Sequence, residues 1–463
     1  MRVLRQIFLV SIIVPFHYAF TQTPDSAVIK QFLKVAEDIQ NAGLGENRAY
    51  GFLADLTSSV GARISGSPEA AKAVTWGKVM MEHLGFQNVH LEPVKVPHWK
   101  RGTIESATLV SPDLHDIHLR ICALGGSIST PTEGVTGEVL EVRSFAELKD
   151  AGARAKGKII FFNSPFDRKK FNTFEAYGGA VDQRGGGAVE AARAGGVAAI
   201  VRSMTSRIDD VPHTGAMWYI DTIPKVPAAA VSTVGANFID SLLSAGKSVR
   251  LCLKLSCETL PEVESANVVG ELVGTDYPEE VIVVGGHLDS WDKGQGAHDD
   301  GAGVVQTLEA LRILHDSGLR PKRTIRAVLF MNEENGLDGG RAYAAKERSG
   351  EKPLAALETD AGGFTPRGFG VQADSSIFEK VARWSFLLRG IDADRITRGG
   401  GGADISPLGT KGVPMIGMRV DSQRYFDYHH SDSDTIDKVN ERELELGGVA
   451  IAILIYTLAQ EGL

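Results

Sequence analysis

The feature of this sequence that most constrains its fold is an unbroken apolar run at residues 281–286, which ends in the triplet His-Leu-Asp at residues 287–289. A strand with one face in water alternates apolar and polar residues, whereas a run that is apolar throughout is typical of a central strand covered on both faces. Such strands belong to α/β sheets, in which catalytic groups gather at the carboxyl ends of the strands. The run therefore predicts an α/β fold with helices on both faces of the sheet, and it directs the search for a site to the strand ends.

The α/β pattern is interrupted in the middle of the chain. Helical periodicity is seen at residues 25–42, 48–60, 67–84, 301–317 and 441–458, and strand-like runs at residues 88–96, 324–331 and 413–420. Between them, residues 103–258 carry many short apolar runs separated by glycine-rich turns, with no visible cluster of catalytic residue types. We interpret residues 23–102 and 259–463 as one catalytic domain, and residues 103–258 as a mostly β domain inserted into it.

The N-terminus predicts export. Arg2 and Arg5 precede an apolar run at residues 7–16, and small or polar residues follow at residues 19–23. This is the pattern of a signal peptide, which we place at residues 1–22, and the run is too short to cross a bilayer core of ~30 Å. We expect a secreted or periplasmic protein with no membrane span in the rest of the chain.

The net charge of the chain limits the classes of partner that we expect, and its cysteine content limits the disulfides. The formal net charge is -9 over 463 residues, with no long basic run, which argues against nucleic acid or an anionic membrane as the main partner. The three cysteines are an odd number, which is no disulfide framework. Cys252 and Cys257 lie in one strand-like run at an odd separation, so that they face opposite sides. We therefore expect them, and Cys122, to be free thiols.

Acidic and imidazole side chains follow two of the expected strands. His287 and Asp289 come directly after the first apolar run, and Glu333 and Glu334 follow the run that ends at residue 331. Taken alone, the first pair is also explained by a structural His–Asp contact and the second by a solvated acidic loop. However, two adjacent carboxylates at a strand end repel each other unless a cation or a proton compensates. One acid as metal ligand beside a second acid as general base satisfies that requirement.

Three more positions complete the candidate set. Asp299 opens an expected helix, where an acid is by itself an N-cap; Asp360 lies where a strand passes into a loop; and His430 lies in a polar loop, where histidines are commonly surface residues. Together with His287 and Glu334 they supply two imidazoles and three carboxylates. Zinc takes nitrogen and oxygen ligands, and two zinc ions can share one carboxylate and one water at a separation of ~3.5–4 Å. The set therefore predicts a two-zinc site.

Four stretches carry a family resemblance. They read Gly-Gly-His-Leu-Asp-Ser-Trp at residues 285–291, Gly-Ala-His-Asp-Asp-Gly-Ala-Gly at residues 296–303, Asn-Glu-Glu-Asn-Gly at residues 332–336, and His-Ser-Asp-Ser-Asp-Thr at residues 430–435. In order, spacing and context they resemble the co-catalytic zinc aminopeptidase and glutamate carboxypeptidase family. The likeness runs from about residue 52 to the C-terminus. It implies a mixed-sheet peptidase domain, and the middle region resembles the protease-associated domain that one branch of the family inserts.

The resemblance implies two zinc ions per chain and a ligand role for each of the five positions. His287, Asp299 and Asp360 would hold one zinc ion. Glu334 and His430 would hold the other, with Asp299 shared between the two ions.

The resemblance also implies roles for the neighbouring residues. Glu333 would be the general base that moves a proton from the attacking water to the leaving amine, and Asp289 would orient the ring of His287. The peptide bond that follows the shared acid is often cis in this family. The chain departs from the family at the next position, where Asp300 stands in place of the asparagine of many relatives, and at His429, where some aminopeptidases have tyrosine. We take His429 as the candidate group that polarises the scissile carbonyl, with Tyr428 as the alternative.

The glycine-rich loop at residues 399–404 has two interpretations. Asp404 precedes an apparent helix start at Ile405 and would serve as its N-cap. Alternatively the loop lines the substrate pocket, in which case Gly402, Asp404 and Tyr428 are the candidate substrate-binding residues.

The implied activity is hydrolysis of dipeptides or short peptides with a free N-terminal amine, by a homodimer. A C-terminal glutamate carboxypeptidase is the closest alternative, and it needs cations aimed at the carboxylates of the substrate. The sequence does not place Arg395 or Arg398 in the pocket. A glutaminyl cyclase would use one zinc ion and a non-catalytic receptor would lack ligands, so the complete set of five disfavours both.

Overall fold

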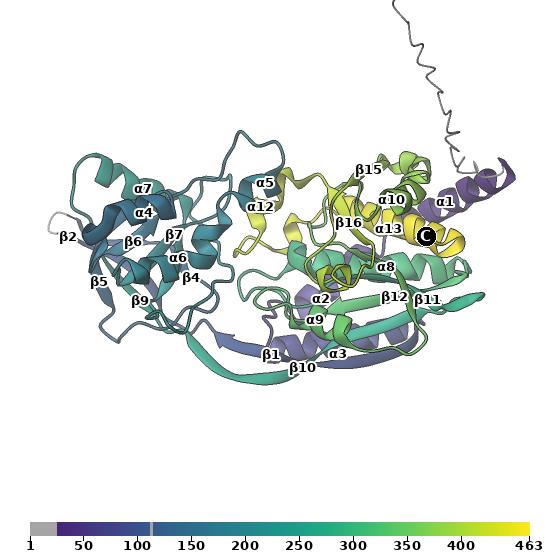
Figure 1. The fold of residues 1–463 in the computed structure, drawn as a ribbon, viewed down its shortest axis with the longest axis horizontal. Coiled ribbons are helices and arrows are strands. Elements are labelled where there is room, and N and C mark those ends of the chain that lie inside the picture. The colour runs from purple at the N-terminus through teal and green to yellow at the C-terminus, as the bar shows by residue number, and fades with distance from the viewer. Residues whose placement is uncertain (1–25, 112–113) are drawn as a thin grey trace, which may run out of the picture.

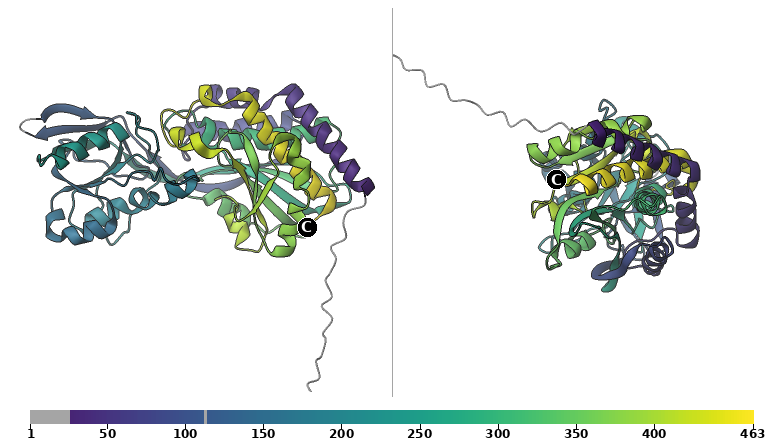
Figure 2. Two further views of the ribbon diagram at one scale, coloured as in Figure 1. Left: turned by 90° about the horizontal axis from the view of Figure 1, so that it is seen from above. Right: turned by 90° about the vertical axis from the view of Figure 1, so that its right-hand side faces the viewer.

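The computed structural model describes residues 26–111 and 114–463, which form two bodies, each built on an eight-stranded sheet (Figure 1). The expected signal peptide at residues 1–22 lies outside the described residues. Seen from above, the two bodies lie end to end along the long axis of the molecule, as Figure 2 shows.

The larger body holds a mixed sheet. Its strand order is β1 (Gln87–Lys100), β10 (Glu258–Leu272), β12 (Arg323–Phe330), β11 (Tyr277–His287), β13 (Lys352–Glu358), β16 (Met415–Val420), β14 (Pro366–Gln372) and β15 (Arg395–Arg398). The central strands β12, β11, β13 and β16 run parallel, and the pairs β1–β10, β10–β12 and β14–β16 are antiparallel. The predicted α/β class and mixed sheet are confirmed.

The apolar run of β11 is buried on both faces, as its sequence predicts. Ile282 and Val284 pack into one core cluster, and Val281 and Val283 into another on the opposite face. Helices that pack into the first cluster include α1 (Ser26–Glu46), α2 (Ala49–Ser59), α3 (Pro68–His83), α8 (Ala302–Asp316) and α13 (Glu441–Glu461). The second is covered by α9 (Asp338–Ala345) and α11 (Ser406–Gly409).

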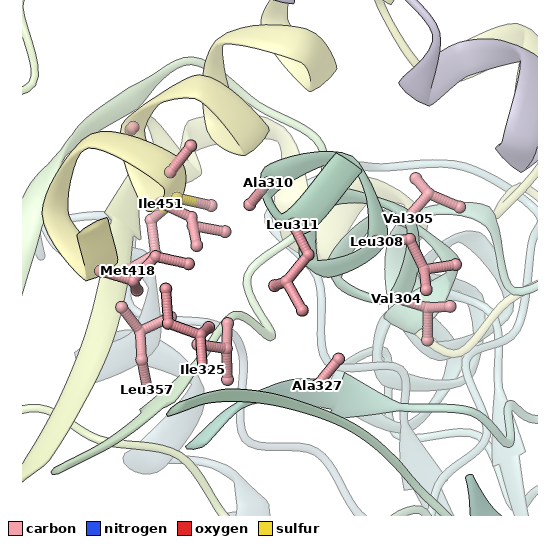
Figure 3. Packing of buried hydrophobic residues seen from close by; sticks show 14 of the residues in the cluster. Val304, Val305, Leu308, Ala310, Leu311, Ile325, Ala327, Leu357, Met418 and Ile451 are labelled. Carbon is pink, nitrogen blue, oxygen red and sulfur yellow. The ribbon is translucent and has the colours of Figure 1, made fainter. Parts of the chain in front are cut away.

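Helix α8 is the centre of this core, and Figure 3 shows its apolar side chains between the sheet and α13. Leu308 and Leu311 belong to the same core cluster as Ile325 and Ala327 of β12 and Ile451 of α13. Helix α13 has the length and hydropathy of a membrane span, which the sequence-based expectation overlooked, but 83% of its apolar window is buried inside the protein. Its apolar surface is therefore explained by packing.

The smaller body is formed by the chain between β1 and β10. Its sheet has the order β3 (Leu114–Leu119), β2 (Glu105–Ser111), β9 (Arg250–Leu255), β5 (Val135–Val142), β6 (Ile159–Phe162), β7 (Ala198–Arg202), β8 (Ala228–Val231) and β4 (Ile121–Ala123). Helices α4 (Phe145–Ala151), α5 (Thr173–Gly178), α6 (Val181–Arg193) and α7 (Thr233–Ser244) belong to the same stretch, so it is richer in helix than its β-like texture predicts. The division at residues 102 and 259 stays our interpretation of the sequence. All three cysteines are free thiols, as expected.

Candidate metal centre

The candidate ligands converge because their strands are parallel neighbours. His287 is the last residue of β11, Glu334 follows β12 and Asp360 follows β13, and both of these strands pair with β11 in parallel. Their carboxyl ends therefore meet at one edge of the sheet. Asp299 reaches the same edge from the turn that opens α8, and His430 from the turn after α12 (Tyr425–Tyr428).

Asp299 lies between the two histidines and offers one oxygen to each. Its Oδ1 is 3.2 Å from Nε2 of His287, and its Oδ2 is 3.3 Å from Nε2 of His430. On the far side, Oδ1 of Asp360 is 3.7 Å from Nε2 of His287, and Oε2 of Glu334 is 3.1 Å from Nε2 of His430. The five side chains thus form two adjoining groups that share Asp299.

The donor set fits divalent metal ions such as zinc. Nε2 of His287 and Oδ2 of Asp299 are buried and, among the described residues, neither has a hydrogen-bond partner that satisfies normal geometry. Buried polar atoms without partners are costly, so their convergence indicates a ligand that is a cation. Imidazole nitrogens and carboxylate oxygens are the ligands that zinc takes in catalytic sites. The residues therefore fit the metal that the sequence predicts, on an observation independent of the motif.

The pKa shifts within the cluster also indicate a bound cation. Burial lowers the pKa of His430, and the carboxylates of Glu334 and Asp299 outweigh it, raising that pKa to about 10. Burial, together with the charge of Asp299, raises the pKa of Glu334 to about 7. Burial also raises the pKa of Glu333 well above its usual value, with Asp360 and Glu334 acting in the same direction. Acids packed this closely hold their charges together only with a compensating cation.

The ring of His287 is oriented by the main chain of Asp289 rather than by its carboxylate. Nδ1 of His287 lies 3.0 Å from the carbonyl oxygen of Asp289, whereas the nearest carboxylate oxygen is 3.9 Å away. That carboxylate instead accepts the backbone N–H groups of Asn332 at 2.8 Å and of Glu333 at 3.1 Å. Asp289 therefore also fixes the loop that carries Glu333, a role that the sequence analysis did not assign.

Asp300 anchors the backbone beside the ligands. The Asp299–Asp300 peptide bond is cis. Oδ1 of Asp300 accepts the backbone N–H of Gly303 at 2.9 Å, and its Oδ2 accepts that of His287 at 3.1 Å. Because both oxygens are engaged by the main chain, Asp300 positions His287 and the start of α8, although it lies within reach of the ligand cluster.

Two buried residues that the sequence analysis did not assign hold the turn of Asp299. Asp434 accepts the backbone N–H groups of His298 at 2.7 Å and of Asp299 at 3.1 Å. Arg63 is fully buried. It donates to the carbonyl oxygens of Leu288 at 2.6 Å, Gln295 at 2.9 Å and Gly296 at 3.0 Å. From the sequence alone, Asp434 could have been identified by its place in the motif at residues 430–435.

The candidates for carbonyl polarisation differ in their positions. The ring of His429 stacks on that of His430, with centroids 3.5 Å apart, and its Nε2 lies 3.7 Å from Oδ2 of Asp299. Tyr428 stacks on His298 instead, at 5.3 Å. The hydroxyl of Tyr425, which the sequence analysis missed, lies 3.5 Å from Oδ1 of Asp360. Its spacing of four residues from His429, one helical turn, was the available signal.

The smaller body directly contacts the loop that contains His429 and His430, which we call the metal-centre loop. Figure 1 shows α5 of the smaller body beside α12. The backbone N–H of Thr214 donates to the carbonyl of His430 at 2.8 Å, and Nδ1 of His430 is 3.3 Å from the carbonyl oxygen of Thr214. Burial lowers the pKa of His213 to about 4, so that its ring is neutral near pH 7. Its Nδ1 lies 2.7 Å from the carbonyl oxygen of His429. The two bodies therefore share this loop.

The loop at residues 399–404 divides into two parts. Gly400 and Gly401 line a cavity of about 830 Å³ that also borders Asp360. Gly402 and Asp404 lie behind it, against the buried carboxyl of Glu358. The N-cap interpretation of Asp404 is wrong, because α11 begins at Ser406 without a side-chain cap. The proposed substrate contacts of Gly402, Asp404 and Tyr428 stay predictions.

Comparison with known proteins agrees with this geometry. Residues 267–454 match the model of peptidase family M28. Carboxypeptidase Q from Bos taurus is 38% identical over 93% of this chain and 90% of its own length. The crystal structure of a peptidase M28 precursor from Shewanella amazonensis SB2B has a TM-score of 0.89 at 34% identity, covering 94% of this chain and 98% of that one. A zinc aminopeptidase from Bacillus subtilis shares the fold, with a TM-score of 0.65 at 20% identity over 90% of this chain and 96% of its own.

The length and level of these matches, taken with the buried histidine and carboxylate cluster, are enough to assign the chain. The chain belongs to peptidase family M28, as a metallo-exopeptidase similar to carboxypeptidase Q.

Proposed function

We propose that the protein binds two zinc ions per chain and hydrolyses dipeptides or short peptides that have a free N-terminal amine. The observation that carries the proposal is the position of Asp299, with one oxygen toward His287 and the other toward His430. Asp360 would complete the site on the His287 side, and Glu334 the site on the His430 side. Both sites would leave room for a water and the substrate.

When bound, the two zinc ions would lower the pKa of the attacking water and stabilise the negative charge that develops on the carbonyl oxygen. The chain supplies the proton transfer through Glu333. Among the described residues, no donor lies within hydrogen-bonding distance of its carboxylate, whose main chain is fixed by Asp289. Glu333 therefore has a free carboxylate to take a proton from the water and pass it to the leaving amine nitrogen.

The carbonyl oxygen of the substrate needs a hydrogen-bond donor from the protein. His429 stands beside Asp299 and would donate through Nε2, as proposed from the sequence. The hydroxyl of Tyr425, near Asp360, is a second donor, and its ring lies beside that of His429, with centroids 5.1 Å apart. A positioned donor of this kind typically contributes roughly 10²–10³ in kcat.

A carboxypeptidase that acts on C-terminal residues is the second candidate, and one observation favours it. Arg395 lines the cavity that borders Asp360, whereas Arg398 lies over the ring of Phe378, 4.3 Å from its centroid. A cation therefore faces the space beside the metal centre, as the carboxypeptidase alternative requires.

The test uses Glu333→Gln, with the exposed Glu347→Gln as matched control. We expect about two zinc ions per chain by elemental analysis in both variants and in the parent, and a loss of dipeptide hydrolysis of roughly 10²–10⁴ only in Glu333→Gln. Retained activity in Glu333→Gln would overturn the assignment of the base. Cleavage of N-acetylated dipeptides would favour the carboxypeptidase, and one zinc ion without cleavage would favour a cyclase-like protein.

We further propose that the protein is exported after removal of residues 1–22, and that it acts as a homodimer. The first proposal rests on the charged and apolar pattern of the N-terminal sequence, and the second on the family resemblance alone. N-terminal sequencing of protein recovered from outside the cytoplasm tests the first, and light scattering of the purified chain tests the second. A retained N-terminus, or a monomeric mass, would contradict them.

A further inference from the structure

The cavity of about 830 Å³ beside Asp360 extends away from the metal centre to the edge of the larger sheet, where β16, β14 and β15 lie side by side. At its metal end it is bordered by Asp360 and Ala361. It is also bordered by Arg395 of β15, the outermost strand, and by Arg419 of β16. A cavity of this size is in the range that holds small ligands.

The two arginines stand on the same face of the sheet because of the strand register. Gly368 in β14 pairs with Arg395 in β15 on one side and with Arg419 in β16 on the other. Directly paired residues point to the same face of a sheet. The residue between the two arginines is glycine, so no side chain fills the space between them.

The next positions on the same face are also small, which lets other parts of the chain approach the sheet closely. Gly370 pairs with Thr397 on one side and with Gly417 on the other. A side chain at Gly370 would meet the carbonyl oxygen of Gly399 at 2.2 Å, and one at Gly417 would meet that of Gly401 at 2.4 Å. The glycines therefore let the loop at residues 399–401 lie directly on the sheet and form a wall of the cavity.

The arginines that border the cavity differ in whether an acid pairs with them. Arg367 is bound by two acids, Asp392 at 2.8 Å and Asp421 at 3.7 Å. Within residues 26–111 and 114–463, no carboxylate lies within ion-pair distance of Arg395 or Arg419. Arg419 is held in place by one hydrogen bond from Nη2 to the carbonyl of Gly399 at 3.0 Å, which leaves its other donors free.

We propose that Arg395 and Arg419 bind a carboxylate of the peptide substrate, an inference that rests on the proposed function of the metal centre. The planar guanidinium matches a carboxylate in shape and donates two parallel hydrogen bonds to it. The carboxylate has two sources, the C-terminus of a short peptide or the side chain of an acidic residue. Both present the same group at a distance from the scissile bond.

Two aromatic side chains of the smaller body also border the cavity. Phe171 is 90% exposed and borders the cavity, with Phe174 next to it. Phe174 is fixed by stacking on Tyr425, at 5.4 Å between ring centroids. An aromatic side chain this exposed beside a cavity is suited to cover the apolar part of a bound peptide, while the arginines take its charged end.

The experiment measures peptide binding by calorimetry to the full-length zinc-loaded protein, in a Glu333→Gln background that does not turn the peptides over. Four probes separate the sources: alanyl-alanine against its C-terminal amide, and glutamyl-alanine amide against glutaminyl-alanine amide. Arg395→Gln and Arg419→Gln are compared with Arg398→Gln, a matched control on the same strand that donates to Ser375 and lies over Phe378. Thermal denaturation checks that each variant is folded.

We expect each pocket variant to weaken binding of one carboxylate probe by roughly ten- to hundred-fold relative to its neutral partner, and Arg398→Gln to change neither. Loss confined to alanyl-alanine identifies the C-terminal carboxylate, and loss confined to glutamyl-alanine amide identifies the acidic side chain. Equal losses within both probe pairs, or none, would overturn the subsite. Hydrolysis by the wild-type protein is measured separately, so that failure to cleave any peptide would count against the proposed function and not against the binding result.

Discussion

The backbone N–H of Thr214 donates to the carbonyl of His430 across the boundary between the two bodies, at 2.8 Å. Thr214 is far from His430 in sequence and stands outside the ligand set, yet it fixes the main chain of a proposed metal ligand. His213 does the same for the neighbouring residue, with Nδ1 at 2.7 Å from the carbonyl oxygen of His429. The smaller body is therefore part of the support of the metal centre.

Removal of this support should weaken metal retention. In His213→Ala the carbonyl of His429 loses its donor, and the turn that carries His430 becomes less constrained. We expect the chain to lose zinc to a chelator roughly tenfold more readily, because removal of a group that supports a ligand typically weakens metal binding by that order. Metal release is followed with a zinc-sensitive dye, without reference to activity. His118→Ala is the control, since His118 is an exposed histidine of the same body that contacts Thr108; equal release from both variants would contradict the prediction.

Tyr425→Phe should impair catalysis while leaving the metal in place. The variant removes a hydroxyl 3.5 Å from Oδ1 of Asp360 but keeps the ring that packs against Phe174 and Phe426. We expect kcat to fall roughly 10- to 100-fold with an unchanged zinc content, since one donor to developing charge is lost. Tyr428→Phe serves as the comparison, because the Tyr428 ring stacks on His298. If Tyr428→Phe proves as costly as Tyr425→Phe, the hydroxyl of Tyr425 has no special role.

Metal removal should destabilise the folded protein. The candidate cluster holds the carboxylates of Asp299 and Glu334 in close proximity and out of water, with Glu333 beside them. A ligand that binds only the native state adds about 2.7 kcal/mol at one hundred times its dissociation constant. We therefore expect a chelator to lower Tm by roughly 3 °C for each ion removed and added zinc to restore it, as read by calorimetry. An unchanged Tm in fully stripped protein would mean that the cluster is stable without a cation.

A buried acid far from the metal centre should make stability depend on pH. Burial, with the nearby charge of Glu309, raises the pKa of Glu445 to about 8. In the unfolded chain this carboxyl ionises near its ordinary value of ~4.3, so the folded state binds more protons in the window between the two values. Stability should therefore fall as pH rises from about 5 to 8.

Glu445→Gln tests this prediction, because the amide can still accept the backbone N–H of Ala49, which lies 3.1 Å from the Glu445 carboxyl, and donate to Glu309. We expect the variant to be more stable than the parent at pH 8 by roughly 1–3 kcal/mol, and the difference to shrink toward pH 5. Urea denaturation at the two pH values measures it. A stability difference that is the same at both values would show that Glu445 does not titrate in this window.

The candidate ligand set could be predicted because most of its members lie at strand ends. The apolar run before His287 marks a central strand, and the adjacent acids Glu333 and Glu334 mark the end of the next one. Parallel neighbours bring such ends together whatever the rest of the fold does. Motif order then added Asp299 and His430, and the structure places all of these side chains at one edge of the sheet.

The supporting residues were not predictable, because their roles depend on contacts between distant segments. Arg63 and His213 are, in sequence, a lone arginine and a lone histidine, and only the tertiary structure turns them toward the carbonyls that they bind. Strand β14 was missed for a related reason. Residues such as Gly368 and Gly370 lower strand propensity, and they are needed there because the neighbouring backbone passes so close.

The ribbon of β1 and β10 has a consequence for how such a protein is assembled and how it could be re-engineered. Lys100, where the chain leaves the larger sheet, is directly paired with Glu258, where it returns. The two ends of the smaller body are therefore held side by side by this strand pair, as the ends of a hairpin turn are. Its length adds little to the entropic cost of bringing β1 and β10 together. The segment between these two residues could be replaced by the corresponding segment of a relative, through two junctions that lie side by side in the structure. The contacts of His213 and Thr214 with the metal-centre loop are then the feature that a graft must reproduce.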